Sequence, residues 1–159
     1  MTFNDLIHES CVICDLNATS KKQLFQEMSA VLIKSGIFNG QEIAERDIVA
    51  GATERERLGS TGVGYGVALP HARLSGIDRV YLVFARLEHP LDFESVDDRP
   101  VDLVALLIAP ENTGGEHLRA LAMVSRKLRR DDMRARLRGA PDAQSLYISL
   151  IENPESHAA

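Results

Sequence analysis

Apolar positions along the chain follow two different spacings, which predict strands and helices. Short runs that are apolar, or that alternate with polar residues, indicate strands at 10–15, 67–69, 79–88 and 101–109. The last run is apolar almost throughout, so we expect that strand to be buried on both faces near the centre of a sheet. Proline cannot donate to a strand ladder, so His89-Pro90 and residues 97–100 predict loops or strand starts.

Apolar spacings of three and four residues predict helices between these strands. A capping pattern at 20–23 begins the first helix, and Gly36 ends it. Its inward row is expected to be Leu24, Met28, Val31 and Leu32. Residues 39–42 cap a second helix, which runs to about Arg57. The apolar face of this second helix carries Ile43, Ala44, Ile48 and Ala52.

Two helix starts are also visible in the last third of the chain. A capping box at 113–116 opens one helix, and Pro141-Asp142 begins another. We expect the first of them to turn inward Leu118, Leu121, Ala122, Ser125 and Leu128. The order of one strand, two helices, three strands and then two or three helices is typical of an α/β layered domain.

The length and charge of the chain limit what it can do. With 159 residues it forms a single domain, which we place at 1–152, followed by a flexible tail at 153–159. Its 18 basic and 23 acidic residues give a net charge of −5, which argues against a general nucleic-acid binder, because phosphate contacts need clustered positive charge. The locally basic stretch 126–138 reads as a solvated helix end, with a docking surface for an acidic partner as the alternative.

Membrane and cysteine signals are weak. No apolar run approaches the roughly 20 residues of a bilayer-spanning helix, and no basic region followed by an apolar segment stands at the N-terminus. We therefore expect a soluble, cytoplasmic protein without membrane insertion. Cys11 and Cys14 have the spacing of a Cys-x-x-Cys motif, but positions i and i+3 of a strand point to opposite faces. The two thiols are therefore predicted to lie in the core rather than in a redox or zinc site.

One histidine ends a glycine-rich run at 59–71. Four glycines between residues 59 and 66 let the backbone pass close to a bulky partner or an anion, and Pro70 fixes φ directly before His71. We take His71 as the candidate reactive group. A tight turn that ends in a core histidine is the alternative.

Two further residues are candidates for the same site. His117 lies in the first turn of a predicted helix, where free N–H groups and the helix dipole favour an anion. Arg55 stands four residues before the glycine run, and its planar guanidinium suits a phosphoryl group. Arg57 is an alternative to Arg55. Each of these residues would be an ordinary solvated side chain if it lay far from His71.

These residues carry a resemblance to a known family. The pattern Gly62-x-Gly64-x-Gly66-x-Ala68-x-Pro70-His71, the Arg-Glu-x-x-Gly at 55–59 and the His-Leu at 117–118 resemble phosphotransferase-system enzyme IIA proteins of the mannitol/fructose type. The nitrogen-related branch, enzyme IIA-Ntr, is the most similar, over nearly the whole chain. The resemblance implies a mixed central β-sheet flanked by helices. It also implies that Nε2 of His71 accepts a phosphoryl group from a histidine phosphocarrier of the NPr or HPr type, supported by His117 and Arg55.

The donor is expected to be another protein, because the sequence lacks the Gly-x-x-x-x-Gly-Lys-Ser/Thr motif of a nucleotide phosphate site. Transfer between two imidazoles requires alignment and charge stabilisation, so no metal ion and no other cofactor is expected. The contact surface for the carrier is predicted to include Gly62, Gly64, Tyr65, Gly66 and Leu69, with Val63 and Leu74 as further candidates. Tyr65 would suit packing under the loop equally well.

Several functions remain open at this stage. The nitrogen-related branch implies target proteins, such as potassium-transport proteins or sensor kinases, whose regulation follows the phosphorylation state. A separate IIA subunit of a fructose- or mannitol-type sugar transporter would instead pass the phosphoryl group to a IIB protein. A metal-dependent hydrolase would combine His71 and His117 with Asp92 or Glu111, but no His-x-His or His-Glu-x-x-His motif supports it.

Two further alternatives lie outside phosphoryl transfer. A dinucleotide-binding loop would need the spacing Gly-x-Gly-x-x-Gly ahead of a helix, whereas this run leads to Pro70. A binding module that acts without phosphorylation would not need His71.

Overall fold

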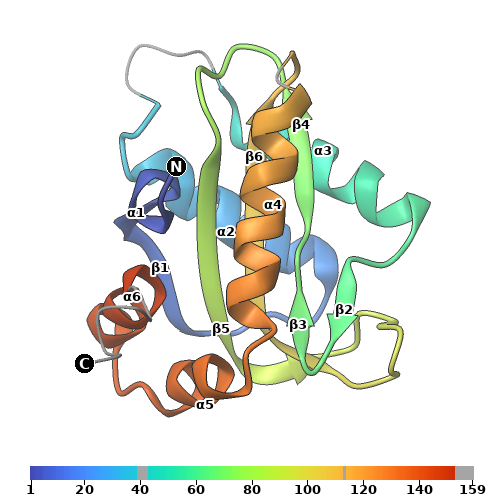
Figure 1. Ribbon diagram of the computed structural model, residues 1–159. Coiled ribbons are helices and arrows are strands. Elements are labelled where there is room, and N and C mark those ends of the chain that lie inside the picture. Colours follow the sequence, from blue (N-terminus) through green and yellow to red (C-terminus); the bar gives the residue numbers. More distant parts are fainter. Residues whose placement is uncertain (39–42, 113, 153–159) are drawn as a thin grey trace.

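A mixed six-stranded sheet forms the middle layer of the protein (Figure 1). The structure is a computed structural model that describes residues 1–38, 43–112 and 114–152. The strands are β1 (Ile7–Leu16), β2 (Gly62–Gly64), β3 (Val67–Ala68), β4 (His71–Leu74), β5 (Tyr81–Leu91) and β6 (Val101–Pro110). The predicted cap at 39–42, residue 113 of the predicted capping box and the predicted tail at 153–159 lie outside the described residues.

Strand β6 is the centre of the sheet. It pairs with β5 on one side in antiparallel orientation, and on the other side with both β3 and β4 in parallel orientation. Strand β1 is parallel to β5, and β2 is antiparallel to β3. Every residue of β6 except Asp102 is buried, as the apolar run predicted. The mixed sheet flanked by helices confirms the expected fold class.

Six helices cover the two faces of the sheet in the described part of the chain. They are α1 (Phe3–Leu6), α2 (Lys21–Lys34), α3 (Glu45–Leu58), α4 (Gly114–Leu128), α5 (Asp131–Gly139) and α6 (Ala143–Ile151). In Figure 1, α4 crosses in front of β6, whereas α2 and α3 lie behind the sheet. Successive strand residues point to opposite faces, so Val83 and Ala85 join the core under α2 and α3 while Leu82 and Phe84 join the core under α4 and α6.

Two predicted helix starts are confirmed with their caps. The Ser20 hydroxyl accepts a hydrogen bond from the backbone N–H of Gln23 at the start of α2, and the Asp142 carboxylate accepts one from Ser145 at the start of α6. Helix α2, the first helix predicted from the sequence, buries Leu24, Met28 and Leu32 as expected. Val31 is only half-buried, and Phe25 fills the core in addition.

The prediction for α3 was wrong at its start. Ile43 and Ala44 precede the helix instead of lying on its inward face. The carboxylate of Asp47 accepts a hydrogen bond from the N–H of Ala44, so the first turn is closed by a side chain inside the helix. The expected Ile48 and Ala52 are fully buried, and α3 ends at Leu58, one residue beyond the expected end.

The predicted inward face of α4 was wrong in part: Leu128 is buried and Leu121 packs against the core as expected, but two other members are not. Leu118 is 62% exposed, and Ala122 is exposed as well. The buried row is His117, Ala120, Val124 and Leu128. An apolar count assigns histidine to solvent, but the packing of α4 on β6 turns His117 inward and rotates the helix accordingly.

Strand β5 runs through His89-Pro90 to Leu91, where the sequence predicted a loop or a strand start. The pairing with β6 shifts register between Arg86 and Leu91, and residues 88–90 are exposed. Pro90 therefore lies where the ladder is interrupted and no N–H donor is needed. The proline at 100 does precede a strand, β6, as expected.

The two cysteines lie in β1 and are free thiols. Cys11 is buried in the core under α2 and α3, and Cys14 packs against the opposite core, as the strand spacing predicted. Cys14 is half-buried, and its Sγ accepts a hydrogen bond of 3.0 Å from Arg86.

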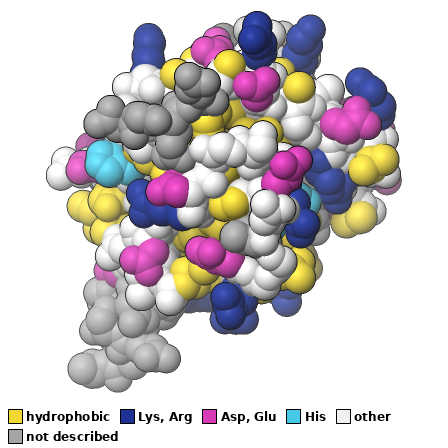
Figure 2. Space-filling model, turned by 90° about the horizontal axis from the view of Figure 1, so that it is seen from above, with side chains coloured by type: hydrophobic (Ala, Val, Ile, Leu, Met, Phe, Trp, Pro, Cys, Tyr) yellow, Lys and Arg dark blue, Asp and Glu magenta, His cyan; other side chains and the backbone are white. Residues whose placement is uncertain are grey.

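The basic stretch 126–138 is only partly a solvated helix end. Arg134 is 6% exposed, and its Nη1 donates to the carbonyl groups of Leu128 and Arg129 at the end of α4. Arg138 pairs with Asp102 at 2.9 Å. These cations thus complement carbonyl groups and carboxylates within the fold. Acidic and basic side chains are also interspersed over the face in Figure 2.

Within the described residues, none of the helices combines the length and the apolar character needed to cross a bilayer.

Candidate functional site

Strand β4 positions His71 at an interruption of the sheet. Strands β3 and β4 lie end to end along β6, with Leu69 and Pro70 between them. The Pro70 carbonyl accepts a hydrogen bond of 3.0 Å from the N–H of Leu107, the residue of β6 that faces His71. Pro70 itself donates nothing. The ladder therefore resumes at His71, which is half-buried.

Helix α3 approaches β4 closely through a glycine. A Cβ atom on Gly51 would lie 2.9 Å from Cβ of Ala72 and 3.3 Å from a methyl group of Leu74. Only glycine permits this separation between the helix and the strand. Arg55 follows Gly51 by one helical turn, so the same face of α3 carries it over His71.

The two ring nitrogens of His71 have different partners. Nδ1 lies 3.1 Å from the carbonyl oxygen of Leu69, and Nε2 lies 3.2 Å from Nε of Arg55. A carbonyl only accepts and a guanidinium only donates, so these contacts assign the proton to Nδ1 and leave the lone pair on Nε2. Arg55 is held in turn by a 2.8 Å hydrogen bond from Nη1 to the carbonyl of Gly59.

The His71 imidazole is neutral at physiological pH. Burial lowers its pKa below the ordinary value, and the guanidinium groups of Arg55 and Arg73 lower it further. The hydrogen bond to Leu69 and the carboxylate of Glu56 raise the pKa, but they offset the lowering only in part. A neutral ring with an unprotonated Nε2 is what a nucleophile at this position requires.

His117 lies beside His71, although the two residues are 46 positions apart in the sequence. The ring centroids are 5.4 Å apart and the ring planes meet at 83°. His117 is 3% exposed, and burial together with His71 and Arg73 lowers its pKa to about 4. Its Nδ1 lies 3.2 Å from Nε of Arg73. The second histidine of the site is therefore also uncharged near neutrality.

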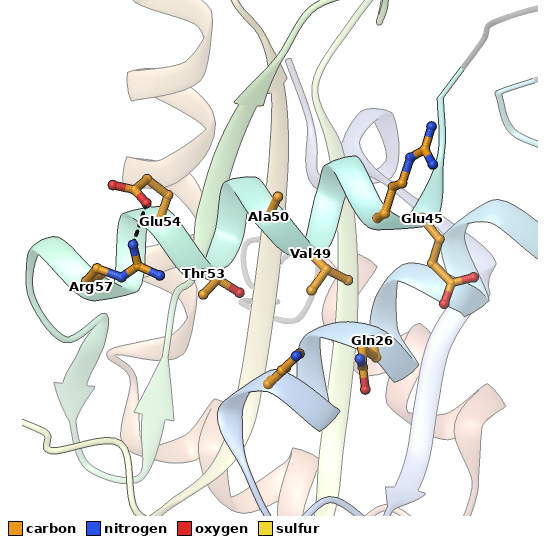
Figure 3. A pocket seen from close by; sticks show the side chains of 9 residues that line it. Gln26, Glu45, Val49, Ala50, Thr53, Glu54 and Arg57 are labelled. Carbon is orange, nitrogen blue, oxygen red and sulfur yellow. Dashed lines mark hydrogen bonds and ion pairs between the residues drawn. The ribbon is translucent and has the colours of Figure 1, made fainter.

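Arg55 belongs to the site and Arg57 does not. Arg57 forms an ion pair of 3.1 Å with Glu54, and both side chains are mostly exposed. Figure 3 shows this pair on α3, beside a hollow of about 630 Å³ between α2 and α3. Arg55 points instead to a depression of about 410 Å³ that it lines together with His71, Arg73 and His117.

The rim of this depression is apolar. Leu58 at the end of α3 is 79% exposed, and Leu118 in the first turn of α4 is 62% exposed. Both line the depression around the two histidines. Exposed leucines beside a group of polar side chains are typical of a contact surface for another macromolecule.

The residues predicted for partner contact do not line this depression. Val63, Gly64, Tyr65 and Leu69 line a neighbouring hollow against the last turn of α4 and the start of α5. Gly62 and Leu69 are themselves buried, and Leu74 borders both the core and a third hollow. Tyr65 is 54% exposed and has a φ of 58°, with its N–H bonded to Asp97 and Arg134 stacked on its ring.

Gly66 has a structural reason to be glycine. Its φ is 77°, and a Cβ atom there would lie 2.4 Å from Nη2 of Arg138 and 2.8 Å from a carboxylate oxygen of Asp102. The Arg138–Asp102 pair thus closes over the turn between β2 and β3. The glycine run serves the path of the backbone here, and its last part delivers His71 to the depression.

Sequence reasoning missed two residues of this region. Arg73 was overlooked because the strand at 71–74 was not predicted; in a strand, residue i+2 shares the face of residue i, which would have drawn attention to it. Glu56 entered the sequence analysis only as part of the Arg-Glu-x-x-Gly pattern at 55–59. Its buried carboxylate in fact accepts hydrogen bonds from Lys21 and from the N–H and hydroxyl of Thr61, and so fixes the loop after α3.

The described part of the chain contains no group of three His, Cys, Asp or Glu side chains placed to hold a metal ion. The metal-dependent hydrolase would need such a group, so these residues offer it no support.

Comparison with known proteins gives consistent matches. The family model described as "Phosphoenolpyruvate-dependent sugar phosphotransferase system, EIIA 2" matches residues 5–153. A nitrogen regulatory protein of Bradyrhizobium diazoefficiens is 44% identical over 159 residues, which is all of both chains. A nitrogen regulatory protein of Pseudomonas aeruginosa is 40% identical over 84% of both chains. The crystal structure of nitrogen regulatory protein IIA-Ntr from Neisseria meningitidis superimposes with a TM-score of 0.83 at 32% identity, covering 92% of this chain and 97% of that one.

Proposed function

The chain belongs to the EIIA 2 family of the phosphoenolpyruvate-dependent sugar phosphotransferase system, and from this premise we propose that it is a regulatory protein that accepts a phosphoryl group on Nε2 of His71. The donor is a phosphorylated histidine of a small carrier protein of the NPr or HPr type. The resulting phosphorylation state then governs the binding of target proteins. The observation that carries the proposal is the lone pair on Nε2 of His71, in a depression shared with Arg55 and His117.

The transfer step exchanges one phosphorus–nitrogen bond for another. The lone pair on Nε2 of His71 attacks the phosphorus atom, and the bond to the carrier's imidazole breaks with its electron pair returning to that ring. The His71 ring then carries the proton on Nδ1 and the phosphoryl group on Nε2. The hydrogen bond to the Leu69 carbonyl stabilises the positive charge that develops on the ring.

Arg55 has two roles in this step. In the unphosphorylated protein its Nε–H occupies the lone pair of His71, so it must turn away from Nε2 as the phosphorus approaches. Its guanidinium then remains within reach of the phosphoryl oxygens, to which it can donate two parallel hydrogen bonds. The contact with the Gly59 carbonyl keeps the side chain near the site during this movement.

His117 supplies a second donor. Its ring lies 5.4 Å from that of His71, a gap that a phosphoryl group can bridge, and its position in the first turn of α4 adds the dipole of that helix. Because its pKa is lowered to about 4, His117 meets the incoming phosphoryl group as a neutral imidazole.

The assignment as a regulator is supported by two relatives, one matched over its full length and one over 84% of it, which are both nitrogen regulatory proteins. The net charge of −5 and the exposed Leu58 and Leu118 suit a protein partner at the depression. Potassium-transport proteins and sensor kinases are the target classes that the sequence resemblance suggests.

The proposal is tested by incubating the protein with phosphoenolpyruvate, enzyme I and a histidine carrier, followed by intact-mass measurement. We expect the wild type to gain one phosphoryl group and His71→Ala to gain none. The exposed His89 provides a matched control, and His89→Ala is expected to be labelled like the wild type. Phosphorus NMR should show the phosphoryl group on Nε2. A label that persists in His71→Ala, or that lies on Nδ1, would contradict the proposal.

The sugar-transport alternative differs in the next step. A IIA subunit of a transporter passes its phosphoryl group rapidly to a IIB protein, whereas a regulator retains it. Adding purified fructose- or mannitol-type IIB proteins to the phosphorylated chain separates the two. We expect the phosphoryl group to remain on His71 for the duration of the assay, and rapid loss to a IIB cysteine would favour the transporter.

A further inference from the structure

Arg73 contacts His117, and no ion pair joins it to a carboxylate of the described residues. Its Nε lies 3.2 Å from Nδ1 of His117. The backbone of Arg73 lies in β4, two residues after His71 and opposite Ala109 of β6. The strand thus presents His71 and Arg73 on the same side, toward the buried His117 of α4.

The chemistry of the two groups decides the direction of this hydrogen bond. A guanidinium never loses its proton and has no acceptor, so Nδ1 of His117 must supply the lone pair. A neutral imidazole with a lone pair on Nδ1 carries its single proton on Nε2. In the other tautomer, two N–H groups would face each other at this distance.

We propose that Arg73 is a positioning residue that holds His117 in the tautomer with the proton on Nε2. This inference rests on the proposed function of the site. In this tautomer Nε2–H is the only free donor of the His117 ring, and it is available to a phosphoryl oxygen on His71. In the other tautomer Nε2 would present a lone pair, which repels an anionic oxygen.

Arg73 is suited to this role by its location. Its side chain is exposed, whereas the His117 ring is 3% exposed. A long solvated side chain can therefore reach into the site without burying an unpaired charge. The positive charge of Arg73 also disfavours the imidazolium form of His117, which adds to the larger effects of burial and of His71 on its pKa.

The tautomer can be measured directly by nitrogen NMR on ¹⁵N-labelled, unphosphorylated protein near pH 7. We expect Nδ1 of His117 to have the chemical shift of an unprotonated ring nitrogen in the wild type. In Arg73→Met, which removes the donor and keeps a similar side-chain length, we expect a mixture of tautomers. Arg73→Lys keeps a cationic donor and should restore part of the wild-type population. This readout does not require phosphoryl transfer, so it remains informative if the proposed function fails.

A double-mutant cycle measures the consequence for transfer. Loss of a hydrogen bond that orients a charge-stabilising group should slow phosphoryl acceptance about tenfold in Arg73→Met. In a His117→Ala background the same substitution should have no further effect, because Arg73 acts through His117. An equal loss in both backgrounds would show that Arg73 contacts the phosphoryl group itself and would overturn the proposal.

Arg119 provides the control. It is an exposed arginine two positions after His117 on α4. Its replacement by methionine removes the same positive charge as Arg73→Met. Arg119→Met should leave both the His117 tautomer and the transfer rate unchanged. A wild-type His117 with its proton on Nδ1, or an unaltered tautomer in Arg73→Met, would also refute the assignment.

Discussion

In each histidine of the site, a hydrogen bond at Nδ1 fixes the tautomer and so determines what Nε2 presents. The Leu69 carbonyl accepts a hydrogen bond from Nδ1–H of His71, and Nε–H of Arg73 donates one to Nδ1 of His117. The two rings therefore present opposite functions to the same space, a lone pair and an N–H donor. Neither assignment requires a charged imidazole, in agreement with the lowered pKa of both groups.

Arg55 should tune the basicity of His71. In Arg55→Met we expect the pKa of His71 to rise, because the guanidinium beside Nε2 is one of the groups that lower it. The rise is partial, since burial is the larger cause and remains. Proton NMR titration of the His71 ring measures the change, and phosphoryl acceptance should fall at least tenfold with the loss of a charge-assisted donor.

Arg57→Met is the matched control for this prediction. Arg57 pairs with Glu54 on the exposed side of α3. We therefore expect Arg57→Met to have the His71 pKa and the transfer rate of the wild type. A His71 pKa that does not change in Arg55→Met would contradict the contact between the two side chains.

At the scale of secondary-structure elements, the distance between α3 and β4 determines whether the site forms. Gly51 faces Ala72 with no room for a Cβ atom, and it stands one turn before Arg55. Helix α3 is anchored at its other end by Glu56, which binds Lys21 of α2 and Thr61 of the following loop. The helix is thus fixed on both sides of Arg55.

Replacing Gly51 by alanine should destabilise the protein although alanine is the better helix former. A Cβ atom 2.9 Å from that of Ala72 would push α3 away from β4. We expect this to lower the free energy of unfolding by about 1–3 kcal/mol. The transfer rate should also fall, since Arg55 moves away from His71. Urea unfolding and the carrier assay measure the two effects.

Gly139 in α5 serves as the comparison, because a Cβ atom there meets nothing within 4 Å. Gly139→Ala should be neutral or slightly stabilising. The double variant Gly51→Ala with Ala72→Gly removes the opposing methyl group and should recover part of the stability. Equal effects of the two single glycine substitutions would exclude a steric cause.

At the scale of the whole molecule, the buried His117 makes stability depend on pH. Its pKa is about 4 in the folded protein and about 6.5 in the unfolded chain, so the unfolded chain binds more protons between these values. The stabilisation is complete above pH 6.5 and is lost as pH falls toward 4. His71, whose pKa is also lowered, acts in the same direction.

The contribution of His117 to this loss is at most about 3 kcal/mol. Urea unfolding at pH 7 and pH 4 should show a smaller decrease in the free energy of unfolding for His117→Gln than for the wild type. His89→Gln, at an exposed position of β5, should retain the wild-type difference. An identical decrease in all three proteins would contradict the lowered pKa of His117.

Features that depend on a few neighbouring residues were predictable from the sequence. The caps at Ser20 and Asp142 join residues three positions apart, and the apolar run of β6 fixes that strand in the centre of the sheet. The reactive position of His71 after Pro70 was inferred from the glycine run and from the family resemblance, and it stays a prediction until phosphorylation is measured. Each of these inferences uses information contained in one short segment.

Only the tertiary structure decided how the segments meet. In the folded chain His117 lies beside His71, and Arg55 rather than Arg57 contacts His71. Arg73, which the sequence did not suggest, contacts His117. The tertiary structure also turned His117 toward the core, against the hydrophobic pattern of α4. The physical reason is that the orientation of a helix on a sheet follows from the sum of many contacts between distant residues, whereas the spacing of apolar residues records only the average preference of its own segment.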